Sequence, residues 1–372
     1  MSAAWLAHQH GFRWNDDGDW QRLPFEDRQP SRAATLHTGA LLLIDEAGML
    51  DQDTALALMT IADEASARVA FMGDRHQLPA VGRGGVLDHA VRWTRPESTV
   101  SLETVRRFAD PEYRDLTLRM RTGEAEDTVF DTLLARGGIV IHASDVERIA
   151  SLAEHGAGGE TVIAAKLEDV AALNAAIQDR RRSDRPEGSA SPVAYGRTDA
   201  IHLGDRIATR QNDRDLDVAN RDTWTVVGSR TRGELEVQGK RGTRTLPISY
   251  VLDHVELAYA TTVHGAQGDT VDRAHLALND TTGAAATYVA MTRGRHSNTA
   301  HLVADSVDSA RAQWTSAFAR DRADLGPEAA RDQALADIER YGPMPTPRPV
   351  RRKDYERFSP SPGSDRGPSI GR

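Results

Sequence analysis

The sequence contains no cysteine, which excludes disulfide bonds, iron–sulfur clusters and thiolate metal sites. Lysine is scarce, because only three of the 46 basic residues are Lys and the others are Arg. Apolar runs such as residues 40–44 are far shorter than the ~20 residues that span a bilayer, so we expect no membrane helix. The first residues lack a basic start followed by an apolar stretch, so no signal peptide is expected, and a cytoplasmic location is the default.

The remaining composition is typical of a globular protein. The chain has 372 residues, which corresponds to two or three domains of the usual ~100–200 residues. Apolar residues make up 39% and charged residues 27%, so a sizeable core can be buried. The net charge of −9 argues against indiscriminate nucleic-acid binding but leaves room for a local basic groove.

Hydrophobic patterns predict an α/β fold. Residues 41–44 indicate a strand with two buried faces, as in a parallel sheet covered by helices. A helix over residues 53–67, capped by Asp53, and a strand over residues 69–72 follow, which implies a right-handed parallel crossover. Further strands are expected at residues 99–102, 139–142 and 161–165, and helices at 113–121 and 167–181.

The pattern changes after a charged and Gly/Ser/Pro-rich loop over residues 179–191. Short strands separated by turn residues predict a small β-barrel or sheet insert, with strands at residues 206–210, 223–227, 234–238 and 244–247. The α/β pattern then returns over residues 255–305.

Two acidic motifs follow neighbouring predicted strands. Asp45 and Glu46 come directly after the first strand, and ligands of open α/β sheets bind beyond the carboxyl ends of strands. An Asp there can hold Mg²⁺ through water, and a following Glu can polarise an attacking water. Asp74 and Gln77 follow the adjacent strand, so we expect them beside Asp45 and Glu46. Each motif alone is equally compatible with a plain strand end or a polar turn.

Two further motifs lie in the second half of the chain. Residues 261–270 follow a strand and open a helix, where backbone N–H groups can meet phosphate. Residues 288–295 form the end of an apolar helix that delivers Arg293. This Arg can clamp a γ-phosphate or merely complement the helix dipole.

Together, in this order and spacing, the four motifs resemble motifs II, III, V and VI of superfamily 1 DNA helicases, in the RecD-like branch. The wording of residues 44–49 and the overall layout look most like the helicase part of conjugative relaxases, and the resemblance covers roughly residues 36–305. It implies two RecA-like parallel-sheet motor domains, the first incomplete, with a small β-barrel insert in the second. The implied parts are 1–105 (first domain), 106–192 and 255–305 (second domain), 193–254 (barrel insert), 306–342 (helical extension) and 343–372 (disordered tail).

The resemblance also implies roles for individual residues. ATP and Mg²⁺ would bind between the two RecA-like domains, and hydrolysis would move single-stranded DNA in the 5′→3′ direction. Residues 104–108 resemble motif IV, with Arg107 at its phosphate-contacting position. The implied catalytic residues are Glu46, Gln77, Arg107 and Arg293; the nucleotide-binding residues are Asp45 (through Mg²⁺ and water), Asp74, Gln267 and Gly268; the DNA-binding residues are Thr262 and His264.

The P-loop that such a motor needs is not found in this sequence. Its pattern, G-x-x-x-x-G-K-[ST], requires a Lys before Ser or Thr, whereas Lys166, Lys240 and Lys353 precede Leu, Arg and Asp. The sequence therefore predicts an N-terminally truncated helicase fragment without P-loop or relaxase domain, with weak or no ATPase activity alone. An upstream fragment that carries both parts is a candidate partner.

Two other functions remain open. The chain could be a non-enzymatic single-stranded-DNA-binding or partner module that reuses the motor scaffold. It could also be a metal-dependent nuclease that uses Asp45, Glu46, Asp74 and His76, although two-metal sites usually need more converging carboxylates.

Overall fold

The computed structural model describes residues 1–14, 20–102, 104–108, 110–183, 191–230 and 234–320, and single residues or pairs between 331 and 342. The chain divides into two compact units, Met1–Gly326 and Pro327–Arg372, and every sheet and site below belongs to the first unit. In the second unit the described residues 331, 334–335 and 338–339 are helical. The predicted tail, 343–372, lies outside the described residues, as do residues 184–190 of the predicted loop.

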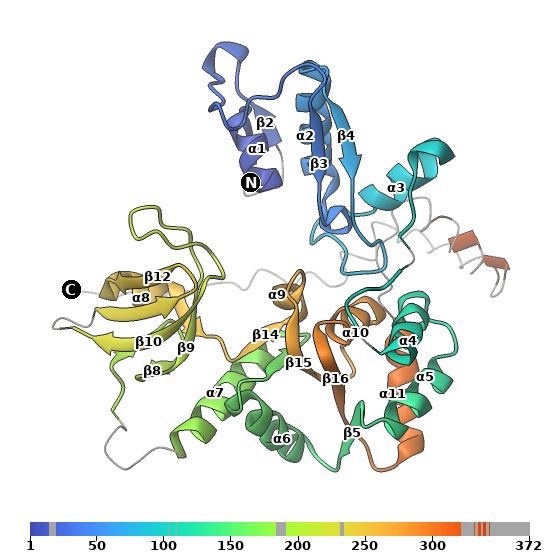
Figure 1. Ribbon diagram of the computed structural model, residues 1–372, viewed down its shortest axis with the longest axis vertical. Coiled ribbons are helices and arrows are strands. Elements are labelled where there is room, and N and C mark those ends of the chain that lie inside the picture. The colour runs from blue at the N-terminus through green and yellow to red at the C-terminus, as the bar shows by residue number, and fades with distance from the viewer. Residues whose placement is uncertain are drawn as a thin grey trace, which may run out of the picture. The chain divides into compact units, whose positions relative to one another are not determined.

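A small parallel sheet forms the first part of the chain (Figure 1). Strands β3 (Leu41–Ile44) and β4 (Arg68–Phe71) pair in parallel and are joined by helix α2 (Gln52–Glu64), as predicted. Helix α1 (Ala3–Gln9) packs against α2, and β1 (Phe12–Trp14) and β2 (Trp20–Arg22) form a separate antiparallel pair. Helix α2 begins after Asp51, which accepts a hydrogen bond from Thr54 N at 2.8 Å, so the predicted cap at Asp53 is wrong.

One face of β3 is exposed, contrary to the prediction of two buried faces. Leu42 and Ile44 join the core formed with α2, whereas the side chains of Leu41 and Leu43 are each 56% exposed. Successive side chains of a strand point to opposite faces, and the described residues cover only the face of Leu42 and Ile44.

The connection from β4 to the next sheet contains no strand among its described residues, and its first helical elements are α3 (Val86–Trp93) and η3 (Pro96–Ser98). Two further short helices lie earlier in the chain, η1 (Phe25–Asp27) before β3 and η2 (Ala47–Met49) between β3 and α2. The predicted strand at residues 99–102 is wrong, because these residues have no regular structure, and Val100 and Leu102 are about four-fifths exposed. Alternating apolar residues suggested a strand, but the segment has no partner strand among the described residues.

The central sheet has five parallel strands in the order β14-β6-β15-β16-β5, which confirms the α/β class. The strands are β5 (Ile139–His142), β6 (Thr161–Ala164), β14 (Ala260–Thr262), β15 (Val271–Ala277) and β16 (Gly294–Val303). The helices around it are α4 (Pro111–Thr122), α5 (Glu126–Ala135), α6 (Asp145–Ala157), α7 (Leu167–Ser183), α9 (Val263–Ala266), α10 (Ala284–Ala290) and α11 (Val307–Phe318).

The two faces of this sheet pack into different cores, as the two-residue period of a strand requires. Ile163, Leu276 and Leu302 pack with α4, α5, α10 and α11. Val162 and Ala277, on the opposite face, pack with α6 and α7. The sheet is therefore the middle of three layers, with α4, α5, α10 and α11 on one face and α6 and α7 on the other (Figure 1).

Histidines occupy part of the α6 face. His275 on β15 and His301 on β16 are buried, with 4% and 0% of their surface exposed. Burial lowers the pKa of His275 and lowers the pKa of His301 to about 2, so both rings are neutral at pH 7.

An antiparallel sheet comes after residue 191, in the order β12-β11-β10-β9-β13. Its strands are β9 (Arg206–Thr209), β10 (Thr223–Ser229), β11 (Leu235–Gly239), β12 (Gly242–Leu246) and β13 (Val255–Leu257). Helix α8 (Ile248–His254) precedes β13, and β7 (Ala194–Tyr195) pairs with β8 (Ala200–Ile201). The four strands predicted here are confirmed, with shifts of one to two residues at their ends.

Asn174 of α7 ties this antiparallel sheet to the central sheet. Its amide Nδ2 donates to Leu257 O at 3.0 Å, and its Oδ1 accepts from Tyr259 N at 2.9 Å and Ala260 N at 2.8 Å. Among the described residues, no helix is both long enough and apolar enough to cross a membrane.

Candidate active site

The loops after β3 and β4 meet backbone to backbone. Ala47 N donates to Met72 O at 2.9 Å, and a Cβ on Gly48 would lie 2.9 Å from Asp74 O. A Cβ on Gly73 would likewise lie 2.9 Å from Ala47 N, so both positions need glycine. These contacts place the Asp74 loop beside the Asp45–Glu46 loop.

Glu46 has an unusual backbone conformation. Its φ of 52° and ψ of 39° are left-handed, a region that residues other than glycine rarely occupy. Asp45 Oδ1 accepts from Glu46 N at 2.8 Å and fixes this turn. Gln267 Nε2 donates to Glu46 Oε2 at 3.3 Å, so the turn after β3 contacts the segment after α9.

Arg293 follows α10 and is almost fully buried. Its Nε donates to Val289 O at 2.8 Å, and its Nη2 donates to Thr292 Oγ1 at 3.0 Å. Its Nη1 lies 3.4 Å from Asp269 O, in the motif that contains Gln267. The guanidinium is therefore held in one orientation by its own helix end and by the neighbouring loop.

Arg107 lies close to Arg293. Its Nη1 donates to Thr292 O at 2.6 Å. Burial and then the charge of Arg107 lower the pKa of Arg293 to about 10, while Glu46 acts in the opposite direction. The Arg293 guanidinium stays charged at pH 7, and an anion placed beside the two arginines would offset their repulsion, as phosphate groups do in arginine sites.

The Asp74 carboxylate lies between elements far apart in the chain. It accepts from Arg121 Nε at 3.1 Å, from Tyr288 OH at 3.0 Å and from His76 N at 3.0 Å. Burial and the charge of Asp74 raise the pKa of Tyr288, so the hydroxyl stays protonated and donates. Asp74 thus joins the loop after β4 to α4 and α10.

Sequence reasoning gave no role to Arg121 or Tyr288. Tyr288 lies within the motif of residues 288–295, and this position in a motif could have pointed to a role for it. Arg121 lies at the end of a predicted helix, and nothing in the sequence connects it with Asp74.

The glutamines of the site each present a buried acceptor. Gln77 Oε1 and Gln267 Oε1 are buried and have no hydrogen-bond partner within the part of the chain that the structure describes. Buried polar atoms are usually paired, so each can accept from a donor such as a bound water. Gly268 has a φ of +85° and open space where a Cβ would stand, so a ligand can approach its backbone. These features fit a bound nucleotide.

Thr262 and His264 lie on one short segment at the carboxyl end of β14. Thr262 Oγ1 accepts from Gly265 N at 3.0 Å and caps α9. Arg221 Nη1 lies 3.3 Å from His264 O. Burial and the charge of Arg221 lower the pKa of His264, so its half-buried ring is neutral at pH 7. Any contact that this ring makes with DNA is one of a neutral group.

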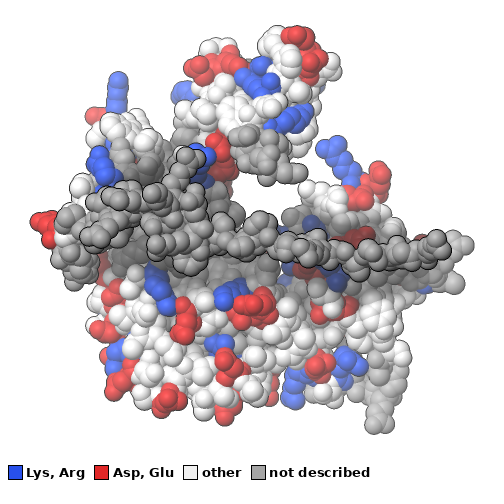
Figure 2. All heavy atoms as spheres, turned by 180° about the vertical axis from the view of Figure 1, so that it is seen from behind, with Lys and Arg blue, Asp and Glu red and all other residues white. Residues whose placement is uncertain are grey.

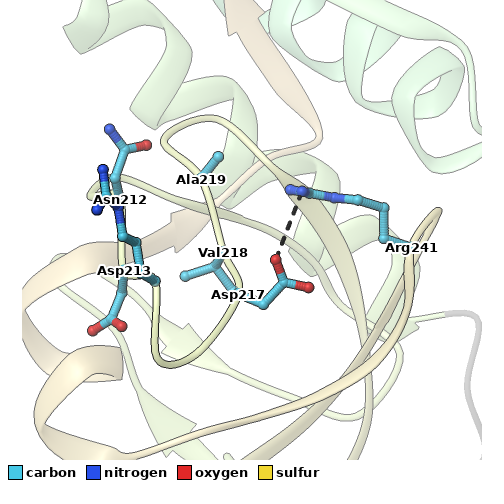
Figure 3. Close-up of a pocket in the computed structure, with 7 residues that line it drawn as sticks. Asn212, Asp213, Asp217, Val218, Ala219 and Arg241 are labelled. Carbon is cyan, nitrogen blue, oxygen red and sulfur yellow. Dashed lines mark ion pairs between the residues drawn. The ribbon is translucent and has the colours of Figure 1, made fainter. Parts of the chain in front are cut away.

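A cavity of about 310 Å³ lies elsewhere, between the loop that joins β9 to β10 and the turn that joins β11 to β12 (Figure 3). Arg241 and Asp217 form an ion pair at 4.0 Å across part of it. Its lining residues are Asn212, Asp213, Arg214, Asp217, Val218, Ala219 and Arg241, and none of the predicted site residues is among them.

The nuclease interpretation receives no support from the geometry. Within the described ranges, the histidines and carboxylates that converge as metal ligands do are His155, His275 and His301. Asp45, Glu46, Asp74 and His76 do not form such a group.

Comparison with known proteins relates this chain to conjugation proteins and helicases. The family described as "AAA domain" matches residues 2–144. The conjugal transfer protein TraA of Agrobacterium fabrum is 27% identical over 269 residues, which are 70% of this chain and 24% of TraA. The uncharacterized protein MT2373 of Mycobacterium tuberculosis is 35% identical over 120 residues, 32% of this chain and 68% of that protein. The chain thus spans about a quarter of the length of the TraA relative.

Solved helicases share the fold. Bacteroides Pif1 bound to single-stranded DNA matches with a TM-score of 0.55 and 16% identity, over 91% of this chain and 84% of Pif1. Pif1 of Candida albicans matches with a TM-score of 0.50 and 14% identity, over 80% of this chain and 76% of that one. From its motifs, its relatives and its fold, the chain belongs to the superfamily 1 helicases, in their RecD-like branch, and is related to the helicases of conjugative relaxases.

Proposed function

We propose that this chain supplies the water-activating and phosphate-clamping part of an ATP-dependent 5′→3′ DNA helicase that acts in plasmid conjugation. The observation that supports this function best is the convergence of Glu46, Arg107 and Arg293 with Gln267. These residues come from four motifs, and Glu46 and Arg293 are 247 positions apart in the sequence. A carboxylate beside two charged arginines is the arrangement that phosphoryl transfer to water requires.

Each residue of the site then has a definite task. ATP with Mg²⁺ would supply the phosphoanhydride bond whose cleavage drives movement. Asp45 would hold the ion through water, and Glu46 would orient and deprotonate the attacking water. Arg107 and Arg293 would stabilise the charge on the transferring phosphoryl group, and Gln77 would accept from the attacking water. Asp74, rather than touching the nucleotide, would fix the loop that carries Gln77 through its bonds to Arg121 and Tyr288.

The contact between Gln267 and Glu46 offers a route from nucleotide to DNA. Gln267 and Gly268 follow directly on α9, whose first turn carries Thr262 and His264. We propose that Thr262 and His264 contact single-stranded DNA. A change in the position of Glu46 would then reach the DNA through Gln267 and α9. Pif1 structures solved with single-stranded DNA, one of them also with ADP-AlF3, support this assignment by fold.

The domain arrangement is part of the same proposal. Residues 1–105 would form part of the first RecA-like domain, and the central five-stranded sheet would form the second. The antiparallel sheet of β9 to β13 would be the small barrel inserted in it, residues 306–342 a helical extension, and the whole would work in the cytoplasm.

We further propose that a P-loop supplied by another segment completes the site. None of the three lysines of the sequence has a P-loop context. The β3–β4 sheet has two strands among the described residues, and Leu41 and Leu43 are each 56% exposed on one face. An apolar face and open strand edges suit the docking of further structure.

The test is ATP hydrolysis by the purified chain with and without single-stranded DNA, compared with Glu46→Gln. We expect little turnover from the chain alone, and DNA-stimulated turnover after addition or fusion of a P-loop-bearing helicase segment. Glu46→Gln should abolish that turnover, because the amide cannot take the proton. Robust activity of the chain alone, sensitive to Glu46→Gln, would overturn the need for a P-loop.

The second candidate function is that of a non-enzymatic DNA-binding module, which the lack of a P-loop lysine favours. It predicts binding of single strands by both the native chain and Glu46→Gln, with no turnover even after a P-loop segment is added. Turnover in the completed protein excludes it.

A further inference from the structure

A cluster of histidines lies on the α6 face of the central sheet, and the proposed function does not use it. We define the histidine cluster as His142, His155, His275, His301 and Glu160. His142 ends β5, His275 and His301 lie on β15 and β16, His155 lies in the last turn of α6, and Glu160 precedes β6. None of these side chains is within hydrogen-bond distance of Glu46, Gln77, Gln267 or Arg293 in the contacts described above.

The rings of the cluster face one another at their nitrogens. His275 Nδ1 lies 3.0 Å from His301 Nε2. The ring of His155 stacks on that of His275, with centroids 3.9 Å apart. One ligand nitrogen from each of these three histidines lies within 4.8 Å of the others. Zinc bound to imidazoles at ~2.0–2.1 Å needs nitrogens little more than 3 Å apart. The ring of His155 stacks on that of His275 at an interplanar angle of 20°, so it has to turn for its nitrogen to face the same ion.

The outer nitrogen of each ring already has a partner. His155 Nδ1 lies 2.8 Å and His275 Nε2 2.7 Å from the same oxygen, Glu160 Oε2. His301 Nδ1 lies 3.0 Å from His142 Nε2. Ligating histidines almost always engage their second nitrogen with a carboxylate or another polar group, which fixes the ring. The nitrogens that these outer partners do not engage are Nε2 of His155, Nδ1 of His275 and Nε2 of His301.

We propose that His155, His275 and His301 bind a divalent transition-metal ion of the zinc class through these three nitrogens. The ion takes the place of the proton shared by His275 and His301. Because neutral His275 donates from Nε2 to Glu160, that shared proton belongs to His301 Nε2. When the ion binds, it moves to His301 Nδ1, which donates to His142 Nε2, and the proton of His142 moves from Nε2 to Nδ1, so the neutral rings release no proton. Glu160 holds the other two rings and offsets part of the ion's charge. Three protein ligands leave a fourth position for water, on the side of His155, whose side chain is 40% exposed.

The chemistry of the donors selects the metal. The site offers three imidazoles and, since the sequence has no cysteine, no thiolate. Imidazole suits zinc, copper, nickel and iron, whereas Mg²⁺ prefers oxygen ligands. The site therefore differs in metal class from the Mg²⁺ position at Asp45. The ion would link α6 to β15 and β16, two neighbouring strands of the central sheet.

The test uses the full chain, stripped with a chelator and dialysed against zinc, with bound metal measured per chain. We expect one zinc per chain and a rise in the melting temperature with zinc, because the ion binds the folded state. His155→Ala, at a part-exposed position, should lose the bound zinc and the thermal shift. Glu160→Gln, which keeps the size of the side chain, should weaken zinc binding ~10–100-fold.

The matched control is His296→Ala, on the same strand as His301 but outside the cluster, with a side chain 64% exposed. It should bind zinc as the native chain does. Circular dichroism of the metal-free variants separates loss of metal from loss of fold. If the native chain retains no zinc, or if His155→Ala and Glu160→Gln both retain it fully, the proposal is wrong.

Discussion

At the scale of single residues, Asp74 is the side chain on which most contacts of the site converge. Its carboxylate, 16% exposed, receives donors from α4, from α10 and from its own loop. We predict that Asp74→Ala lowers the free energy of unfolding by ~1–3 kcal/mol, because it leaves the Arg121 guanidinium and the Tyr288 hydroxyl without this acceptor. Urea denaturation of the whole chain measures the change.

Two further variants define the origin of that effect. Tyr288→Phe should cost ~1 kcal/mol, and the double variant should cost less than the sum, because the two side chains share one bond. Asp280→Ala, at an exposed position, is the control and should leave stability within ~0.5 kcal/mol. Strict additivity of the two changes would show that the Asp74–Tyr288 bond contributes nothing.

Only some of the contacts of Asp74 can be predicted from the sequence. Proximity of Asp74 to Asp45 and Glu46 follows from parallel strands, and the backbone contacts of Gly48 and Gly73 agree with it. The partners Arg121 and Tyr288 depend on how α4 and α10 pack, 47 and 214 positions away in sequence. No local pattern encodes such contacts.

At the scale of elements, Asn174 joins α7 to the end of β13 and to the start of β14. We predict that Asn174→Ala costs at least ~3 kcal/mol, since it leaves one buried carbonyl and two buried N–H groups without a partner, each worth ~1–3 kcal/mol. Denaturant unfolding checks this value. Asn220→Ala, on the surface, should change stability by less than ~0.5 kcal/mol, and an equal loss in both variants would contradict the assigned role.

Most elements could be predicted because their apolar residues recur with a clear period, as in β10 and β11 of the antiparallel sheet. The strand predicted at residues 99–102 and the buried outer face predicted for β3 are wrong for one cause. Residues 99–102 and the outer face of β3 are apolar, yet the described residues give them no partner, so Val100, Leu102, Leu41 and Leu43 are exposed. The spacing of apolar residues predicts which side chains a segment can bury, but it does not predict which other segment packs against them. The histidine cluster was missed for the same reason, since its members come from five separate segments.

At the scale of the whole molecule, the sequence has more acidic than basic residues, 55 against 46. The net charge is −9, and on the face seen in Figure 2 the acidic and basic side chains alternate without a broad patch of one sign. We predict that single-stranded DNA binds through few phosphate contacts. About three contacts correspond to a slope near −2 in a plot of log affinity against log salt, as fluorescence anisotropy can measure.

Substitution of His264 tests whether this residue contacts DNA as a neutral group. Because the lowered pKa of its ring keeps it mostly neutral at pH 7 and above, His264→Ala should weaken DNA binding but leave the salt slope unchanged between pH 7 and pH 8. Thr270→Ala, on the exposed loop beyond the segment, is the matched control and should alter neither quantity. A slope reduced by ~0.7 in His264→Ala would mean that the ring is charged when it meets a phosphate.

The fixed guanidinium of Arg293 bears on how quickly the site can act. A free arginine side chain gives up ~1.5–2 kcal/mol of rotational entropy when it is immobilised. Here Val289 O and Thr292 Oγ1 restrict the side chain in the folded chain, before any anion arrives. An incoming phosphate therefore meets an oriented partner instead of waiting for one rotamer among many. Recognition at this position should depend on diffusion of the anion more than on rearrangement of the protein.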